Sequence, residues 1–240
     1  MQDKNFQNLS YTKTHRAVET AGLICYFSLM LYSLKVILKI AELESELPWL
    51  FLFLFAAMLA DFVAGMVHWG ADTWGTETTP FFGSWLIRSF REHHVDPKAI
   101  TRHDFVETNG AVAVGLSPLL FAFIIYLPAS PSRFQAIAFV LFILFSFWIL
   151  FTNQIHKWSH QQTQPLFVRI LQKIGLALSP THHQGHHTAP FDKRYCITNG
   201  WMNPILDKIG YFRFLERTIH TLTGEIPRDY ETPPISNSAP

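Results

Sequence analysis

Four long apolar stretches limit what this chain can fold into. They cover residues 20–40, 47–67, 111–128 and 134–155, and each approaches the roughly 20 residues that an α-helix needs to cross a bilayer. One such stretch could be a buried helix of a soluble protein, but four of them in 240 residues favour a membrane bundle. Charged residues make up only 15% of the chain, against about 25% in soluble domains. We therefore predict an all-α integral membrane protein with four transmembrane helices.

The basic residues lie mostly on one side of the four stretches. If all four cross the bilayer, the segments 1–19, 68–110 and 156–240 share a side, and they hold sixteen of the nineteen Lys and Arg residues. Loops rich in Lys and Arg remain in the cytosol. We therefore expect this side, and both termini with it, to be cytosolic.

The rest of the composition sets the domain organisation. We predict one membrane-embedded domain over residues 1–230, followed by a disordered tail at 231–240, because the end of the chain is rich in Pro and Ser. A net charge of +1 gives no support for nucleic-acid binding. The two cysteines, Cys25 and Cys196, are far apart in sequence, which excludes a Cys-x-x-Cys metal pair.

Nine of the twelve histidines gather in four places on the predicted cytosolic side, or at the helix ends that reach it. Neutral imidazole is a common ligand for zinc, copper and iron, and residues three or four apart share a helix face. We expect the four places to converge on one centre of two irons, held by a cytosolic, histidine-rich helical cap. Together with Asp72 the histidines are too many for one tetrahedral zinc. The candidate ligands are His68, His93, His94, His156, His160, His182, His183, His186 and His187.

Two aspartates lie near His68 in the sequence. Asp72 follows His68 by four residues, so it could bind a metal directly or orient a ligand imidazole. Asp61 lies within about 20° of the same line along a helix. A carboxylate inside a span is costly unless it faces a partner or a cavity. We expect Asp61 to line a lipid pocket, to bond within the bundle, or to pack against polar groups near Lys35.

The remaining histidines have less specific surroundings. His93 and His94 are adjacent, so they differ by about 100° around a helix and could serve different ions. We place His103 with Asp72 among the candidate catalytic residues, as a contact to a lipid headgroup or a support behind the ligands, and Asp104 beside it could cap a helix. His15 and His220 are expected to be ordinary surface residues.

An amphipathic pattern follows the fourth apolar stretch. Apolar residues recur there at helical spacing, with Arg169 and Lys173 between them, which is typical of a helix lying on a membrane surface. Packing against the cytosolic cap is an equally good explanation. The apolar residues are Leu166, Phe167, Ile170, Leu171, Ile174 and Leu178.

Five segments resemble the Kua-type lipid desaturases, and among them most closely the branch that forms plasmalogens. They are HWGADTWG (68–75), FREHHVDPKAITRHDFVETNG (90–110), QIHKWSH (154–160), HHQGHH (182–187) and YCITNGWMN (195–203). The resemblance covers roughly residues 15–230. It places the family's essential aspartate on Asp72, and its essential histidines on all the candidate ligands except His182, whose role is less defined.

This resemblance implies a specific reaction. The family members are multi-pass enzymes of the endoplasmic reticulum in eukaryotes, or of the inner membrane in bacteria, with two irons bound by histidine. They use molecular oxygen and two electrons, delivered through cytochrome b5, on a phospholipid that stays in the bilayer. Their reaction removes two hydrogens from the sn-1 alkyl ether chain of a plasmanyl phospholipid such as plasmanylethanolamine, and it gives a vinyl ether.

Three alternatives remain open from the residues alone. A related desaturase could act on fatty-acyl chains, for example those of phosphatidylglycerol. A lipid hydroxylase could use the same metal centre, because hydroxylation and desaturation begin with the same hydrogen removal. A membrane zinc carrier would place its ionisable residues near the bilayer midplane, whereas these histidines gather at helix ends and in loops.

Overall fold

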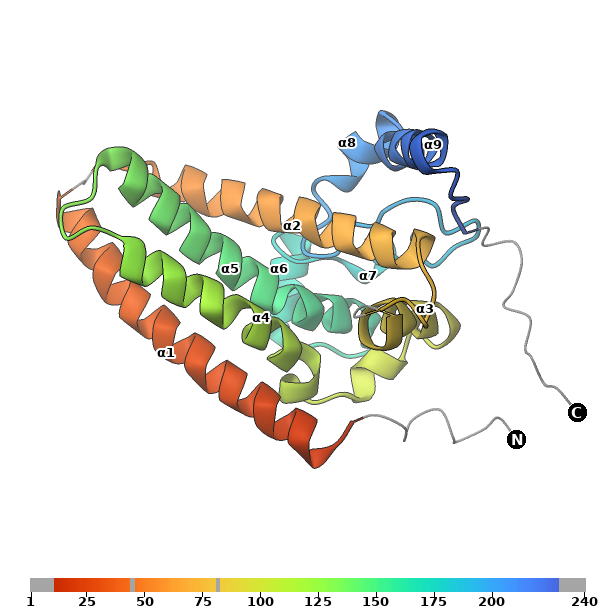
Figure 1. Cartoon of the computed structure of the whole chain (residues 1–240), viewed down its shortest axis with the longest axis horizontal. Coiled ribbons are helices and arrows are strands. Elements are labelled where there is room, and N and C mark those ends of the chain that lie inside the picture. Colours follow the sequence, from red (N-terminus) through yellow and green to blue (C-terminus); the bar gives the residue numbers. More distant parts are fainter. Residues whose placement is uncertain (1–10, 44–45, 81–82, 229–240) are drawn as a thin grey trace, which may run out of the picture. The chain divides into compact units, whose positions relative to one another are not determined.

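The computed structural model describes residues 11–43, 46–80 and 83–228 (Figure 1). Every regular element in these ranges is a helix, which confirms the all-α prediction. The contacts of the described residues divide them into two compact units: one contains the described residues up to 57 together with 103–154, and the other contains the described residues of 58–102 together with those from 155 onward. The predicted tail at 231–240 lies outside the described residues.

Unit 1 is a bundle of long helices. It contains α1 (Lys13–Leu43), the start of α2 (Trp49–Thr73), α4 (Phe105–Tyr126) and most of α5 (Arg133–His160). α1 and α4 lie side by side (Figure 1), and they approach closely because a side chain at Gly22 would collide with Val114. The core of this unit is apolar, with Tyr26, Leu120 and Phe139 fully enclosed.

The start of α4 is fixed by a helix cap. The Asp104 carboxylate accepts a hydrogen bond from the backbone N–H of Glu107 at 3.0 Å, which confirms the capping role expected for it. Such a cap satisfies one of the N–H groups left unpaired at the first turn of a helix.

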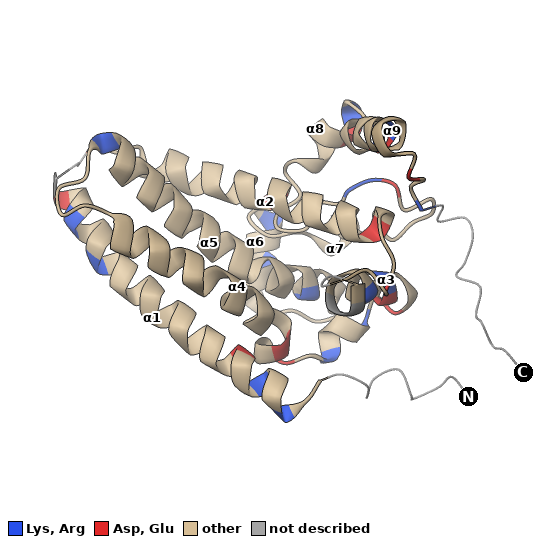
Figure 2. Cartoon of the chain, viewed as in Figure 1, with Lys and Arg blue, Asp and Glu red and all other residues tan. Residues whose placement is uncertain are grey.

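Four helices in the described part of the chain are long and apolar enough to cross a membrane: Lys13–Glu42, Trp49–Thr73, Phe105–Tyr126 and Arg133–His160. In unit 1 the charged residues lie toward the ends of α1 and α4, and the middle of each helix is uncharged (Figure 2). Large apolar side chains such as Leu31 and Phe121 are exposed on these helices, as lipid-facing positions would be. The protein is therefore a multi-pass membrane protein.

Unit 2 combines the ends of two long helices with several short ones. It takes α2 from residue 58 and α5 from residue 155. A small core of Trp69, Tyr195, Cys196, Leu206 and Phe212 packs inside it. The shorter elements are the π-helical turn η1 (Gly83–Ile87), α3 (Arg88–Val95), the 3₁₀ turn η2 (Ala99–Arg102), α6 (Leu166–Lys173), α7 (Pro180–Gln184), α8 (Asn203–Lys208) and α9 (Tyr211–Thr223).

The first part of the amphipathic pattern forms α6, which ends at Lys173, before Ile174 and Leu178. Leu166, Phe167, Ile170 and Ile174 are exposed, while Leu178 beyond the helix is buried. Most of this apolar face is thus not used for packing within the described residues, which favours the membrane surface over the cap as its environment.

Candidate metal centre

Nine of the predicted site residues meet in two groups inside unit 2. The first, the five-histidine cluster, consists of His93, His156, His160, His183 and His187. The second, the Asp72 cluster, consists of His68, Asp72, His94 and His186. Within each group, one ligand atom from every residue lies within 4.8 Å of the others. Both groups could therefore hold a metal ion.

Helix periodicity explains how the residues divide. Residues four apart, such as His68 and Asp72 on α2 or His156 and His160 on α5, share a face and enter the same cluster. Adjacent residues do not share a face, and His93 and His94 at the end of α3 enter different clusters. The short α7 and the turn after it repeat this division, since His183 and His187 join one cluster and His186 joins the other.

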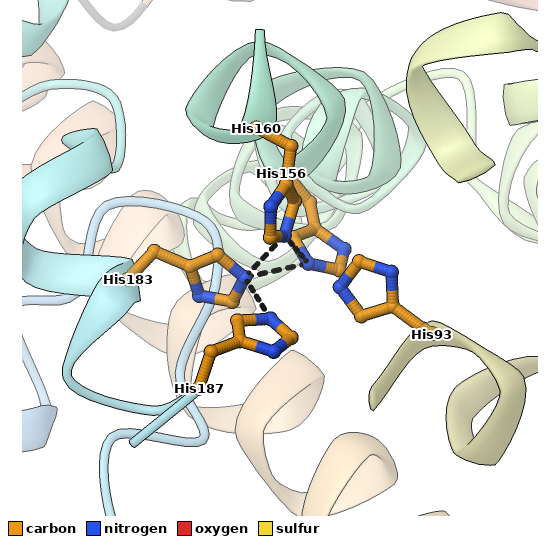
Figure 3. A group of neighbouring side chains, drawn as sticks. All are labelled: His93, His156, His160, His183 and His187. Atoms are coloured by element: carbon orange, nitrogen blue, oxygen red, sulfur yellow. Dashed lines mark hydrogen bonds between the residues drawn. The ribbon is translucent and has the colours of Figure 1, made fainter. Parts of the chain in front are cut away.

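The imidazoles of the five-histidine cluster point toward one another from α3, α5 and the α7 segment (Figure 3). Nε2 of His183 lies 2.7 Å from Nε2 of His160, 2.8 Å from that of His156 and 3.0 Å from that of His187. A neutral imidazole carries one N–H, so His183 can donate to only one of these three nitrogens. Whether it donates or accepts, this one nitrogen forms a well-aligned hydrogen bond with only one of the three, so the other contacts bring ring nitrogens together without a hydrogen bond. A bound cation would stabilise such an arrangement.

The Asp72 cluster surrounds one carboxylate oxygen. Oδ2 of fully buried Asp72 lies 3.0 Å from Nε2 of His94, 3.2 Å from that of His68 and 3.5 Å from that of His186. A buried carboxylate is costly without a positive partner. The cluster supplies an anionic ligand that the five-histidine cluster lacks.

Two backbone carbonyls fix the tautomers of two imidazoles in this cluster. Nδ1 of His68 lies 3.0 Å from the carbonyl oxygen of Tyr195, and Nδ1 of His186 lies 2.8 Å from that of Lys193. A carbonyl only accepts, so each Nδ1 must carry the hydrogen and each neutral ring has a bare Nε2 lone pair. Two lone pairs then face the Asp72 carboxylate, and a metal cation placed among them would satisfy all three. The residues present therefore fit a metal ion.

Burial keeps the histidines outside the spanning helices in the form that binds metals. Burial, together with the neighbouring imidazoles, lowers the pKa of His93 and His183 well below the usual range. Burial is also the main cause that lowers the pKa of His186 to about 4. These rings are neutral at neutral pH, and only a neutral imidazole offers a nitrogen lone pair to a cation.

His182 and His103 lie outside both clusters. Asn203 accepts from the backbone N–H of Cys196 through Oδ1 at 2.8 Å, so its Nδ2 is the atom that donates to Nε2 of His182 at 2.9 Å. The His182 lone pair is therefore already used. His103 belongs to unit 1, where its Nε2 lies 3.6 Å from a carboxylate oxygen of Glu107.

His15 and His220 are exposed, as expected for surface residues.

The sequence did not show how Asp61 is used. Of the environments considered for it, the structure shows bonding within the fold: the fully buried Asp61 carboxylate accepts four backbone N–H groups from residues 198–202. The only signal in the sequence was a carboxylate inside an apolar stretch. The backbone carbonyls of Lys193 and Tyr195 left no signal at all, because any residue type provides one.

Comparison with known proteins gives the family. The lipid desaturase domain matches residues 57–230. The plasmanylethanolamine desaturase of Myxococcus xanthus is 41% identical over 229 residues, which are 95% of this chain and 80% of that protein. Plasmanylethanolamine desaturase 1 of Mus musculus is 44% identical over 223 residues, 91% of this chain and 82% of that protein.

A chloroplast protein is more distant. Fatty acid desaturase 4 of Arabidopsis thaliana is 34% identical over 178 residues, 73% of this chain and 53% of that protein. The comparison with solved structures gave no match. The domain match and the two longer alignments nevertheless cover most of the chain. The chain therefore belongs to the lipid desaturase family, which makes it an oxidoreductase with a lipid substrate.

Proposed function

We propose that this protein converts the sn-1 alkyl ether chain of a plasmanyl phospholipid, such as plasmanylethanolamine, to a vinyl ether, with two irons and molecular oxygen. The observation that carries the proposal is the pair of clusters, in which adjacent histidines of α3 serve both sites. The names of the bacterial and mouse relatives, which cover most of the chain, support the substrate. Two electrons would come from a cytochrome b5-type donor.

The chain's own groups have defined tasks in this proposal. All nine clustered residues would hold the irons, whose role would be to activate molecular oxygen as the oxidant for an unactivated C–H bond, which no side chain can do. The carbonyls of Tyr195 and Lys193 keep Nε2 of His68 and His186 free to bind. Asp72 supplies negative charge, and the complete burial of Asp72, His68 and His186 keeps water away from this part of the centre.

Orientation and compartment belong to the same proposal. The uneven distribution of Lys and Arg supports a cytosolic metal centre and cytosolic termini, in the endoplasmic reticulum of a eukaryote or the inner membrane of a bacterium. Glycosylation tags placed at 131 should be modified in a eukaryotic host, and tags at either terminus should not. Modification of a terminal tag would refute this orientation.

Lipid analysis tests the reaction. The full chain is expressed in a host that lacks plasmalogens, supplied with plasmanylethanolamine, beside a His183→Ala variant as the inactive control. We expect acid-labile vinyl ethers, with the loss of two hydrogens from the ether lipid, only with the unmodified protein. An added oxygen would indicate a hydroxylase, and a new double bond confined to acyl chains would indicate an acyl desaturase; either result would refute the proposed reaction.

A further inference from the structure

Asp61 holds a loop that lies far from it in the sequence. Its Oδ1 accepts from the backbone N–H groups of Thr198, Asn199 and Gly200 at 2.9, 3.0 and 3.0 Å, and its Oδ2 accepts from Met202 at 3.1 Å. Successive backbone N–H groups form a concave site for an anion, and hydrogen bonds to a charged acceptor are about twice as strong as neutral ones. The N–H groups of this loop thus compensate the negative charge of the buried carboxylate that α2 carries.

The same face of α2 contacts the loop at two further positions. A side chain at Gly65 would collide with Cys196, so the loop lies directly against the helix backbone there. One turn later, Nδ1 of His68 donates to the carbonyl oxygen of Tyr195. Residues 61, 65 and 68 share one helix face, and residues 195–202 follow that face.

The loop also carries the carbonyl that orients His186, the other imidazole of the Asp72 cluster that bonds a backbone carbonyl. Lys193 accepts from Nδ1 of His186, and Tyr195 accepts from His68. Arg194 between them has a φ of 60°, which is an unfavourable conformation for a residue with a side chain. Such a conformation persists only when its surroundings impose it. The direction in which both carbonyl groups point therefore depends on how the loop is anchored.

We propose that Asp61 is a positioning residue: it anchors the loop 193–202 so that the carbonyls of Lys193 and Tyr195 orient His186 and His68 for metal binding in the Asp72 cluster. This inference rests on the proposed metal centre. The effect should be selective, because among the described residues no loop carbonyl bonds a ring nitrogen of the five-histidine cluster in the same way. There, Nδ1 of His183 and of His187 has no hydrogen-bond partner among the described residues.

Two variants disturb the anchor at different points. Asp61→Asn keeps the size of the side chain but removes its charge, and it places an N–H₂ group where an acceptor is needed. Gly65→Ala pushes against Cys196 and so displaces the same loop without changing any charge. Glu216→Gln is the matched control, because Glu216 is another buried carboxylate of unit 2 that accepts from Trp69 Nε1 of α2 at 2.9 Å.

The measurement is cobalt(II) binding to the full-length protein in detergent, followed by metal analysis and by the visible absorption of bound cobalt. Unmodified protein and Glu216→Gln should bind two ions per chain. Asp61→Asn and Gly65→Ala should bind one ion normally and the other about 10- to 100-fold more weakly, as losses outside the ligand set typically do. At a cobalt concentration that fills only the stronger site of Asp61→Asn, adding His94→Ala should remove no bound ion, whereas adding His183→Ala should remove the one that is bound.

The outcomes separate the two claims. If the unmodified protein binds fewer than two ions, the proposed metal centre fails and this inference fails with it. If it binds two, and folded Asp61→Asn binds both with unchanged affinity and spectrum, only the inference is refuted. Equal weakening of both ions in a folded variant would also refute it. If Asp61→Asn does not fold, Gly65→Ala decides by the same criteria.

Discussion

The two histidine clusters differ in what orients their ligands. The five-histidine cluster depends on helix spacing: His156 and His160 lie one turn apart on α5, and His183 and His187 are four residues apart. The Asp72 cluster depends in addition on a loop whose carbonyls fix two of its imidazoles. One cluster offers only neutral nitrogen and the other adds a carboxylate. The structure therefore offers two candidate metal sites that differ in charge and in what orients their ligands.

The largest effect should follow removal of Asp72, because its carboxylate is the charge that distinguishes the Asp72 cluster from the five-histidine cluster. Asp72→Ala leaves His68, His94 and His186 without their common partner. Losses outside the ligand set cost about 10- to 100-fold in affinity or activity, and loss of a direct ligand should cost more. We expect no detectable vinyl ether and one bound ion instead of two, measured by lipid mass spectrometry and metal analysis. A variant with full activity and two ions would remove Asp72 from the centre.

The division between the clusters is tested by the adjacent histidines. His93→Ala and His94→Ala should each lower the metal content by one ion, but from different clusters. His93→Ala combined with His183→Ala should then still lose one ion, because both belong to one cluster. His93→Ala combined with Asp72→Ala should lose both. If the two pairs give the same metal content, the division into two sites is wrong.

A smaller effect is expected at His182. His182→Ala removes a hydrogen bond from Asn203 and takes no lone pair from either cluster. Loss of one such bond costs about 0.5–1.5 kcal/mol of unfolding free energy. Thermal unfolding should report this decrease while the protein keeps two ions. Loss of an ion in a folded His182→Ala protein would restore the ligand role that the sequence suggested.

The smallest effect is expected at His103, which belongs to neither cluster. His103→Ala replaces an exposed side chain, and such changes usually alter the unfolding free energy by less than about 0.5 kcal/mol. We expect two ions, unchanged stability, and a weaker apparent affinity for lipid if His103 contacts a headgroup. Loss of metal in this variant would connect His103 to the centre.

Much of the fold could be predicted from local patterns. The four apolar stretches became the four long helices, but with different ends: α1 begins at Lys13 and α5 continues to His160, beyond their stretches, whereas α4 ends at Tyr126, before residue 128. Hydropathy records only the part of a helix suited to the bilayer interior, whereas backbone hydrogen bonding continues into polar residues. The pairs of histidines four apart were equally readable, because helix periodicity alone brings them together.

The rest could not be read in advance, because it depends on contacts between distant segments. Asp61 is 137 residues from Thr198, and His68 is 127 residues from Tyr195. Neither contact repeats at any period, and two of the four groups involved, the N–H of Thr198 and the carbonyl of Tyr195, belong to the backbone. The position of His182 was hidden for a similar reason: its sequence neighbours are candidate ligands, and only the distant Asn203 shows that its nitrogen is already paired.

The contact between α2 and the loop 193–202 has a consequence for exchanging parts between related enzymes. On α2, Asp61 accepts from backbone amides in the segment 198–202, Gly65 lies against Cys196, and His68 bonds the carbonyl of Tyr195. A chimera that takes α2 from one parent and this loop from another would join surfaces that were shaped separately. The two segments should be transplanted together, so the smallest exchangeable module of this enzyme is discontinuous in sequence.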